Sequence, residues 1–96
     1  MSVLVLIDLK FKPESIMAAK ALLQQGLPQI HDFDGCQDAT LHVNQDDIHN
    51  LMFVEHWESQ QHYERYRAWR AERGDNARLV SMLAEPLMVR CFEVVK

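Results

Sequence analysis

The sequence predicts an α+β fold in which four strands form one antiparallel sheet and helices cover one of its faces. Two apolar patterns support this. Segments 2–11, 37–44, 50–57 and 87–95 alternate apolar and polar residues or are rich in β-branched residues, as strands are. The segments that begin at Pro13 and Ser59 instead carry apolar or aromatic residues at helical spacing. The predicted order is β-α-β-β-α-β, with a short extra helix before the last strand.

The first strand is apolar on both faces, because Val3 and Val5 alternate with Leu4 and Leu6. Pro13 suits the first turn of the helix that follows, since its ring fixes a helical φ angle. The apolar stripe of this helix consists of Ile16, Ala19, Leu23, Leu27 and Ile30. Gly26 and Pro28 lie inside the stripe, and they predict that the helix kinks or ends early.

The second half of the chain starts with a turn at residues 32–35, and residues 45–47 form the loop of a hairpin. Ser59 has the side chain of a helix N-cap, and the helix it starts is expected to run to about Arg73. Gly74 and its neighbours then break that helix. A short helix is expected over residues 77–83.

This order is the ferredoxin-like arrangement, whose helices leave the other face of the sheet bare. Here the bare face is apolar in the first and last strands, and an exposed apolar sheet face implies a partner. The simplest partner is a second copy packed face to face, which would give a homodimer with two-fold symmetry.

Composition narrows the function classes. The 96 residues, 1–96, are expected to form one domain. A net charge of −4 argues against nucleic-acid binding, which needs a basic face. Cys36 and Cys91 are too few for a disulfide framework, so we expect free, buried thiols and a cytoplasmic protein. The apolar start is interrupted by Asp8 and Lys10 and predicts neither a signal peptide nor a membrane segment.

The second long helix is unusually aromatic. On a helical wheel, one side carries His62, Tyr63, Tyr66, Trp69, Arg70 and Arg73, and the other carries Gln61, Glu64, Arg65, Ala68 and Glu72. The first side should meet the sheet. Its polar tips need partners, which a ligand pocket would supply. The alternative is that the rings are core anchors whose polar tips reach the rim. We favour the core role for Tyr63 and the pocket role for Tyr66.

The chain resembles one protein family over nearly its whole length, and three sequence features carry the resemblance. They are Lys12-Pro13 after the first strand, Gly35-Cys36 before the second, and the E-x-W-x-S pattern of Glu55-His56-Trp57-Glu58-Ser59. The chain resembles the antibiotic biosynthesis monooxygenase family, whose members adopt the dimeric α+β barrel. The resemblance implies a reaction without metal, flavin or other cofactor: a phenol, anthrone or hydroquinone loses a proton, its anion gives an electron to dioxygen, and the radical pair recombines.

The same resemblance suggests a site. Trp57, Tyr66 and Trp69 would form walls, His62 or His42 would move a proton, and Arg70 would stabilise the oxyanion. This assigns His62, Tyr66 and Arg70 to catalysis and Trp57, Trp69 and His42 to substrate binding. Haem degradation is disfavoured, because the positions of that branch's strand-one Asn and haem-ligating His hold Ile7 and Asn76.

The other polar residues give weaker signals. The five histidines do not show the spacing of a zinc helix, so no metal site is predicted. Glu55 is expected to be a hydrogen-bonded structural carboxylate, and Trp57 could equally be a core anchor. Two other functions stay open on this fold, a non-catalytic small-molecule-binding or stress-associated dimer and an isomerase or cyclase.

Overall fold

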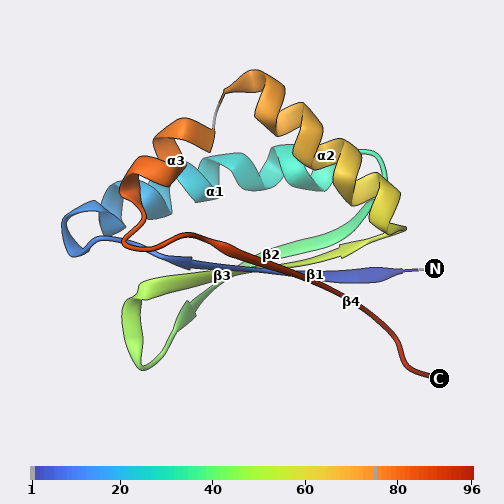
Figure 1. Cartoon of the computed structure of the whole chain (residues 1–96), viewed down its shortest axis with the longest axis horizontal. Helices are drawn as coiled ribbons and strands as arrows, with labels where there is room; N and C mark the ends of the chain where they lie inside the picture. Colours follow the sequence, from blue (N-terminus) through green and yellow to red (C-terminus); the bar gives the residue numbers. More distant parts are fainter. Residues whose placement is uncertain (1, 75) are drawn as a thin grey trace.

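The computed structural model describes residues 2–74 and 76–96. The strands are β1 (Val3–Lys10), β2 (Cys36–Asn44), β3 (Asp47–Trp57) and β4 (Met88–Glu93). The helices are α1 (Ile16–Asp32), α2 (Gln60–Arg73) and α3 (Asn76–Met82), and a 3-10 turn, Pro13–Ser15, precedes α1. The sheet is antiparallel with strand order β2-β3-β1-β4, and the helices lie on one face (Figure 1). The predicted ferredoxin-like α+β fold is confirmed.

Helix α1 does not end early. It continues through Gly26 and Pro28 to Asp32, so the prediction of an early end is wrong. Burial explains the continuation: Ala19, Leu23 and Ile30 of the predicted stripe are buried in the core, and this packing outweighs the low helix propensity of Gly and Pro. None of the described helices is long and apolar enough to cross a bilayer.

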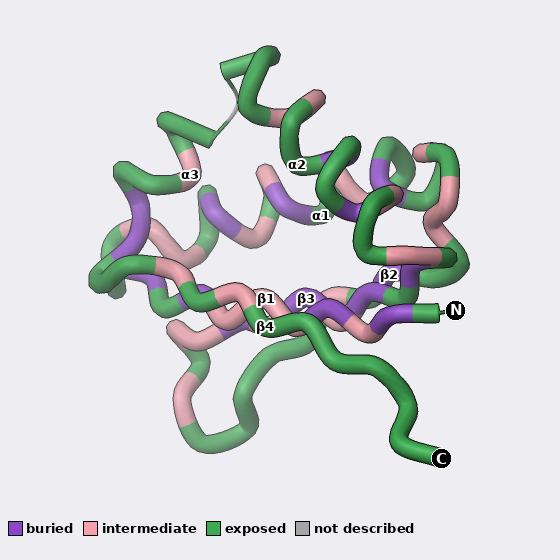
Figure 2. Tube along the Cα trace, turned by 45° about the vertical axis from the view of Figure 1, so that its right-hand side comes forward, coloured by how far each residue is buried: buried purple, intermediate pink, exposed green. Residues whose placement is uncertain are grey.

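Strand alternation divides the sheet into two faces. The residues of β1 and β3 that point to the helices are the most buried in the sheet, and they include Val5, Leu9, Leu51 and Trp57. Figure 2 shows this buried layer between the sheet and α1 and the exposed C-terminal segment. Cys91 of β4 is exposed, so the expected burial of both thiols is wrong for this residue.

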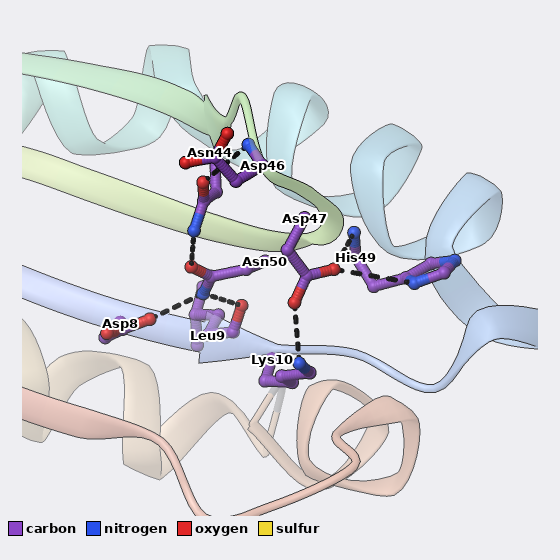
Figure 3. A network of polar contacts seen from close by, with 8 residues as sticks. All are labelled: Asp8, Leu9, Lys10, Asn44, Asp46, Asp47, His49 and Asn50. Atoms are coloured by element: carbon purple, nitrogen blue, oxygen red, sulfur yellow. Dashed lines mark hydrogen bonds and ion pairs between the residues drawn. The ribbon is translucent and has the colours of Figure 1, made fainter.

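A polar network at one end of the sheet holds β1, β2 and β3 in register (Figure 3). The Asn50 amide donates to the Asp8 carboxylate at 2.6 Å and to the Leu9 carbonyl at 3.1 Å. The Asn44 amide donates to the Asn50 side-chain oxygen at 3.0 Å. At the same end of the sheet, Lys10 Nζ forms an ion pair with Asp47 Oδ2 at 2.6 Å. A one-residue slip of the hairpin would break these bonds and turn the buried face outward.

The start of α2 is fixed to the start of β2. Ser59 caps the helix as predicted, because its hydroxyl accepts from the His62 backbone N–H at 3.2 Å. The Gly35 carbonyl accepts from the Glu58 N–H at 2.7 Å. Gly35 has a φ of +91°, and a Cβ there would overlap the His62 side chain. Glycine is therefore needed at this position both for the backbone and for the close approach of α2.

Gly74 provides a matched comparison, since its φ is also positive, at +75°, but a Cβ there would meet no described residue. We expect Gly74→Ala to lower the free energy of unfolding by about 1 kcal/mol, the cost of a left-handed Ala. Gly35→Ala adds the overlap with His62 and should cost about 3 kcal/mol. Urea denaturation measures both, and His62→Ala should recover part of the Gly35→Ala loss. Equal losses for the two glycine variants would contradict the close packing of α2 at Gly35.

Candidate functional site

A cavity of about 650 Å³ lies between the sheet and the helices. Its floor consists of Ile7 and Leu9 of β1, Phe53 and Glu55 of β3, and Val89 of β4. One wall is α1, the opposite wall is α2, and α3 closes one end. The cavity is large enough for a compound of two or three fused rings, because ligand pockets span ~300–1,000 Å³. We call it the inter-layer pocket.

Among the residues that the structure describes, Glu55 is the one charged or polar residue buried in the core, with 1% of its surface exposed, and it lies on the pocket floor. Trp57 donates its indole N–H to Glu55 Oε1 at 2.9 Å, which confirms the expected hydrogen-bonded carboxylate. Burial raises the pKa of Glu55, because the charged form is poorly solvated there; the Trp57 bond and the Arg70 charge oppose the rise only in part. A carboxylate of raised pKa is a suitable proton acceptor near neutral pH.

Tyr66 and Arg70 form the polar part of the α2 wall. Arg70 Nε donates to the Tyr66 hydroxyl oxygen at 2.7 Å. That bond leaves the Tyr66 proton available for donation to another acceptor. Burial raises the pKa of Tyr66 despite Arg70, so the hydroxyl stays protonated and acts as a donor. Arg70 also reaches the Gly26 carbonyl at 3.5 Å, and a Cβ on Gly26 would lie 3.0 Å from its guanidinium.

The aromatic residues behind this wall form one cluster around Tyr66. Its ring centroid lies 5.2 Å from that of Trp57 and 5.3 Å from that of Phe33. Trp69 packs on Phe33 at 5.3 Å and under the Arg73 guanidinium at 4.6 Å. Trp57 is fully buried, and neither tryptophan is among the pocket-lining residues. Both therefore support the wall from behind and do not form its surface.

The two predicted histidines lie outside the pocket. His62 Nδ1 is 2.6 Å from Ser59 Oγ, and its Nε2 is 3.9 Å from both Asp34 and Glu58, at the start of α2. His42 pairs with Met52 on the face of the sheet that is turned away from the helices, and bonds Thr40 at 2.8 Å. Placing His42 in one pocket with Tyr66 is therefore wrong, because β2 alternation sends its side chain to the opposite face.

The helical wheel correctly predicted the orientation of α2. Tyr63 and Tyr66 are buried, while the residues assigned to the solvated side are exposed. Tyr63 combines both of the roles considered for it, since it is a core residue, 2% exposed, that also lines the pocket.

Among the pocket residues that were not predicted are Glu55 and Arg67. Glu55 was assigned a structural role alone, although strand alternation places it on the same face as Trp57. Arg67 lies at the edge of the inward side of the wheel and was assigned to neither side, yet it lines the pocket.

The arrangement can hold a planar apolar ring between the sheet floor and α2. Glu55 is a proton acceptor on the floor, and Tyr66 with Arg70 is a donor pair in the α2 wall. In the described ranges 2–74 and 76–96, no group of three or more His, Cys, Asp or Glu is placed to hold a metal. Glu55 can abstract a proton from a bound ring, and Tyr66 and Arg70 can stabilise the resulting anion.

Comparison with known proteins identifies the family. The sequence profile of the family described as "Antibiotic biosynthesis monooxygenase" matches residues 2–71. The chain belongs to this family. No curated protein matches the chain.

Solved structures with the same fold include Rv0793 from Mycobacterium tuberculosis (21% identity, TM-score 0.89, 100% of this chain and 97% of that one). They also include PA3566 from Pseudomonas aeruginosa (18% identity, TM-score 0.80, 99% of this chain and 95% of that one). A third is a single-residue mutant of SnoaB from Streptomyces nogalater, which is described as a cofactor-independent oxygenase (10% identity, TM-score 0.83, 99% of this chain and 94% of that one). At these identities the likeness shows a shared fold.

The raised pKa of Glu55 has a consequence for how the stability of the protein depends on pH. Above the ordinary glutamate pKa of 4.5, the unfolded chain releases this proton more readily than the folded one, so Glu55 lowers stability as pH rises. Glu55→Gln removes that penalty. We expect the unfolding free energy of the variant, relative to wild type, to increase between pH 4.5 and pH 8. Urea titrations across this range test it, with Glu72→Gln on the exposed side of α2 as the control. A constant difference would show that Glu55 has an ordinary pKa.

Proposed function

We propose that this protein is a cofactor-independent monooxygenase that oxidises a small phenol, anthrone or hydroquinone with dioxygen. The observation that carries the proposal is the inter-layer pocket, an apolar space with a buried carboxylate on its floor and the Tyr66–Arg70 donor pair in its α2 wall. Membership of the monooxygenase family supports it, as does the fold shared with SnoaB, a cofactor-independent oxygenase.

In the proposed reaction, Glu55 accepts a proton from the substrate, and the Tyr66 hydroxyl and Arg70 stabilise the oxyanion that forms. The anion passes one electron to dioxygen, and the resulting radical pair combines at a ring carbon. One oxygen atom becomes a new carbonyl, and the other leaves as water together with two substrate hydrogens. Oxygen and substrate thus balance without an external reductant. Glu55 is assigned the role that the sequence had suggested for His62 or His42, because those histidines lie outside the pocket.

Oxygen consumption with a panel of anthrones, phenols and hydroquinones, without added cofactor, tests this proposal. We expect Glu55→Gln to lower kcat by about 10² or more through loss of the proton acceptor. Tyr66→Phe should lower kcat by about 10² through loss of an oxyanion donor. His62→Ala is the matched control and should retain wild-type kcat. Transfer of label from ¹⁸O₂ to the product separates a monooxygenase from an oxidase.

The pH dependence of kcat/KM offers a second readout. Activity needs the ionised Glu55, so it should fall as pH drops through the raised pKa of this group. Tight binding of the panel with no oxygen uptake by the wild-type protein would contradict the proposed reaction and favour the non-catalytic binding protein.

We also propose that the protein is a homodimer through the face of the sheet that carries no helices. Leu4 and Leu6 of β1, Val54 of β3 and Phe92 of β4 lie on this face, since they alternate with the buried residues. Phe92 is 45% exposed and Met88 is 58% exposed in the single chain. A second copy would cover this apolar surface and remove it from water.

Leu6→Arg places a charge near the middle of that face. We expect it to convert a dimer into a monomer, as measured by sedimentation equilibrium. Ala68→Arg on the exposed side of α2 is the control and should remain dimeric. A wild-type protein that is monomeric at high micromolar concentration would contradict the proposal.

A further inference from the structure

The mouth of the inter-layer pocket is strongly basic, although the whole protein is acidic, with a net charge of −4. Four arginines line the pocket, namely Arg67, Arg70, Arg73 and Arg78. Among the described residues that line it, Glu55 on the floor is the one acid. The charge at the pocket is therefore opposite in sign to that of the chain, and the pocket attracts anions from an otherwise repelling surface.

The arginines are arranged along the mouth. Arg67, Arg70 and Arg73 are three residues apart on α2, which places them in a row on neighbouring turns. Arg78 faces the same opening from α3. Arg70 is half-buried against Tyr66, whereas Arg67, Arg73 and Arg78 are exposed. The half-buried Arg70 is thus flanked on α2 by the exposed Arg67 and Arg73.

Two of these guanidinium groups have no acidic partner within the part of the chain that the structure describes. Within residues 2–74 and 76–96, no carboxylate forms an ion pair with Arg67 or Arg78. Arg65, on the outer side of α2, differs from them, since it lies 3.8 Å from Asp34. Arg67 instead lies over the Tyr63 ring, with its Cζ 5.9 Å from the centroid. Its charge is therefore held beside an aromatic wall of the pocket, where a ring-bearing anion would be bound.

We propose that the substrate is an aromatic compound that carries a carboxylate, with its rings inside the pocket and its carboxylate at the arginines of the mouth. This inference rests on the proposed function and specifies its substrate class. A planar carboxylate matches the two parallel N–H donors of a guanidinium group. At the mouth the carboxylate keeps part of its hydration, so binding it there costs little desolvation.

The same charges determine how the substrate enters. A carboxylate that entered first would lose its hydration against Ile7, Leu9 and Phe53 and would approach Glu55. The opposite orientation places the carboxylate at the mouth, where Arg67 and Arg78 lie, and the far end of the ring system next to Glu55. Oxidation is therefore directed to the ring position remote from the carboxylate. Arg67 and Arg78 are specificity-determining residues in this arrangement and take no part in proton transfer.

A matched pair of ligands, a hydroxynaphthoic acid and its carboxamide, tests the inference by calorimetry under anaerobic conditions. We expect the acid to bind about tenfold more tightly than the amide, as for a charge-assisted hydrogen bond. Added salt should weaken binding of the acid and leave the amide unchanged. The double variant Arg67→Gln/Arg78→Gln should remove the preference for the acid. Arg65→Gln, whose guanidinium lies outside the pocket, should retain it.

The results distinguish failure of this inference from failure of the proposed function. An amide that binds as tightly as the acid, or a preference lost equally in Arg65→Gln, would overturn the carboxylate subsite and leave the oxygenase proposal intact. A preference for the acid that depends on Arg67 and Arg78, without oxygen consumption in air, would support the subsite and overturn the oxygenase. Failure of both ligands to bind would overturn both. Because Arg67 and Arg78 are exposed, the double variant should unfold at the wild-type temperature.

Discussion

The hydrogen bond from the Trp57 indole to Glu55 is the interaction on which the site depends. Both residues lie on the helix-facing side of β3, two positions apart, and both are almost fully buried. A carboxylate at this depth is costly unless a donor satisfies it, and the indole is that donor. The same indole ring packs against Tyr63 and Tyr66 of α2. One residue therefore both retains an acid under the pocket and positions the opposite wall.

This arrangement explains why the polar aromatic residues gather in one stretch of sequence. Tyr63, Tyr66 and Trp69 are not independent pocket residues; they are successive layers of one cluster that includes Phe33 and Trp57. Large rigid rings can fill a core while leaving a hydroxyl or a guanidinium partner at its surface. A helix of Leu and Val would pack as well but would offer no donor to a bound molecule. The composition of α2 thus meets the demands of core and pocket together.

The sequence predicted the strands, the helices and the inward side of α2, because these follow from local periodicity and from the Ser59 cap. It predicted the site less well. His42 was placed in the site from the family resemblance, whereas the alternation of β2 turns its side chain to the face opposite that of Ala39 and Leu41. Trp57 and Trp69 were assigned to the pocket surface from the family resemblance, which does not show how deeply a side chain is buried behind the wall. Arg67 was missed because its angle falls at the boundary between the two sides.

Gly26 shows how pocket chemistry can override helix propensity. A glycine inside α1 weakens the helix by about 1 kcal/mol relative to alanine, and Pro28 nearby weakens it further. The structure gives a reason for the glycine: the Arg70 guanidinium lies against it and would be only 3.0 Å from an added Cβ. An alanine here would require the end of the Arg70 side chain, which forms the donor pair with Tyr66, to shift by a few tenths of an ångström. Because α1 is held by Ala19, Leu23 and Ile30, the fold tolerates the weak point. The local loss of helix stability therefore leaves room for a cation beside the pocket.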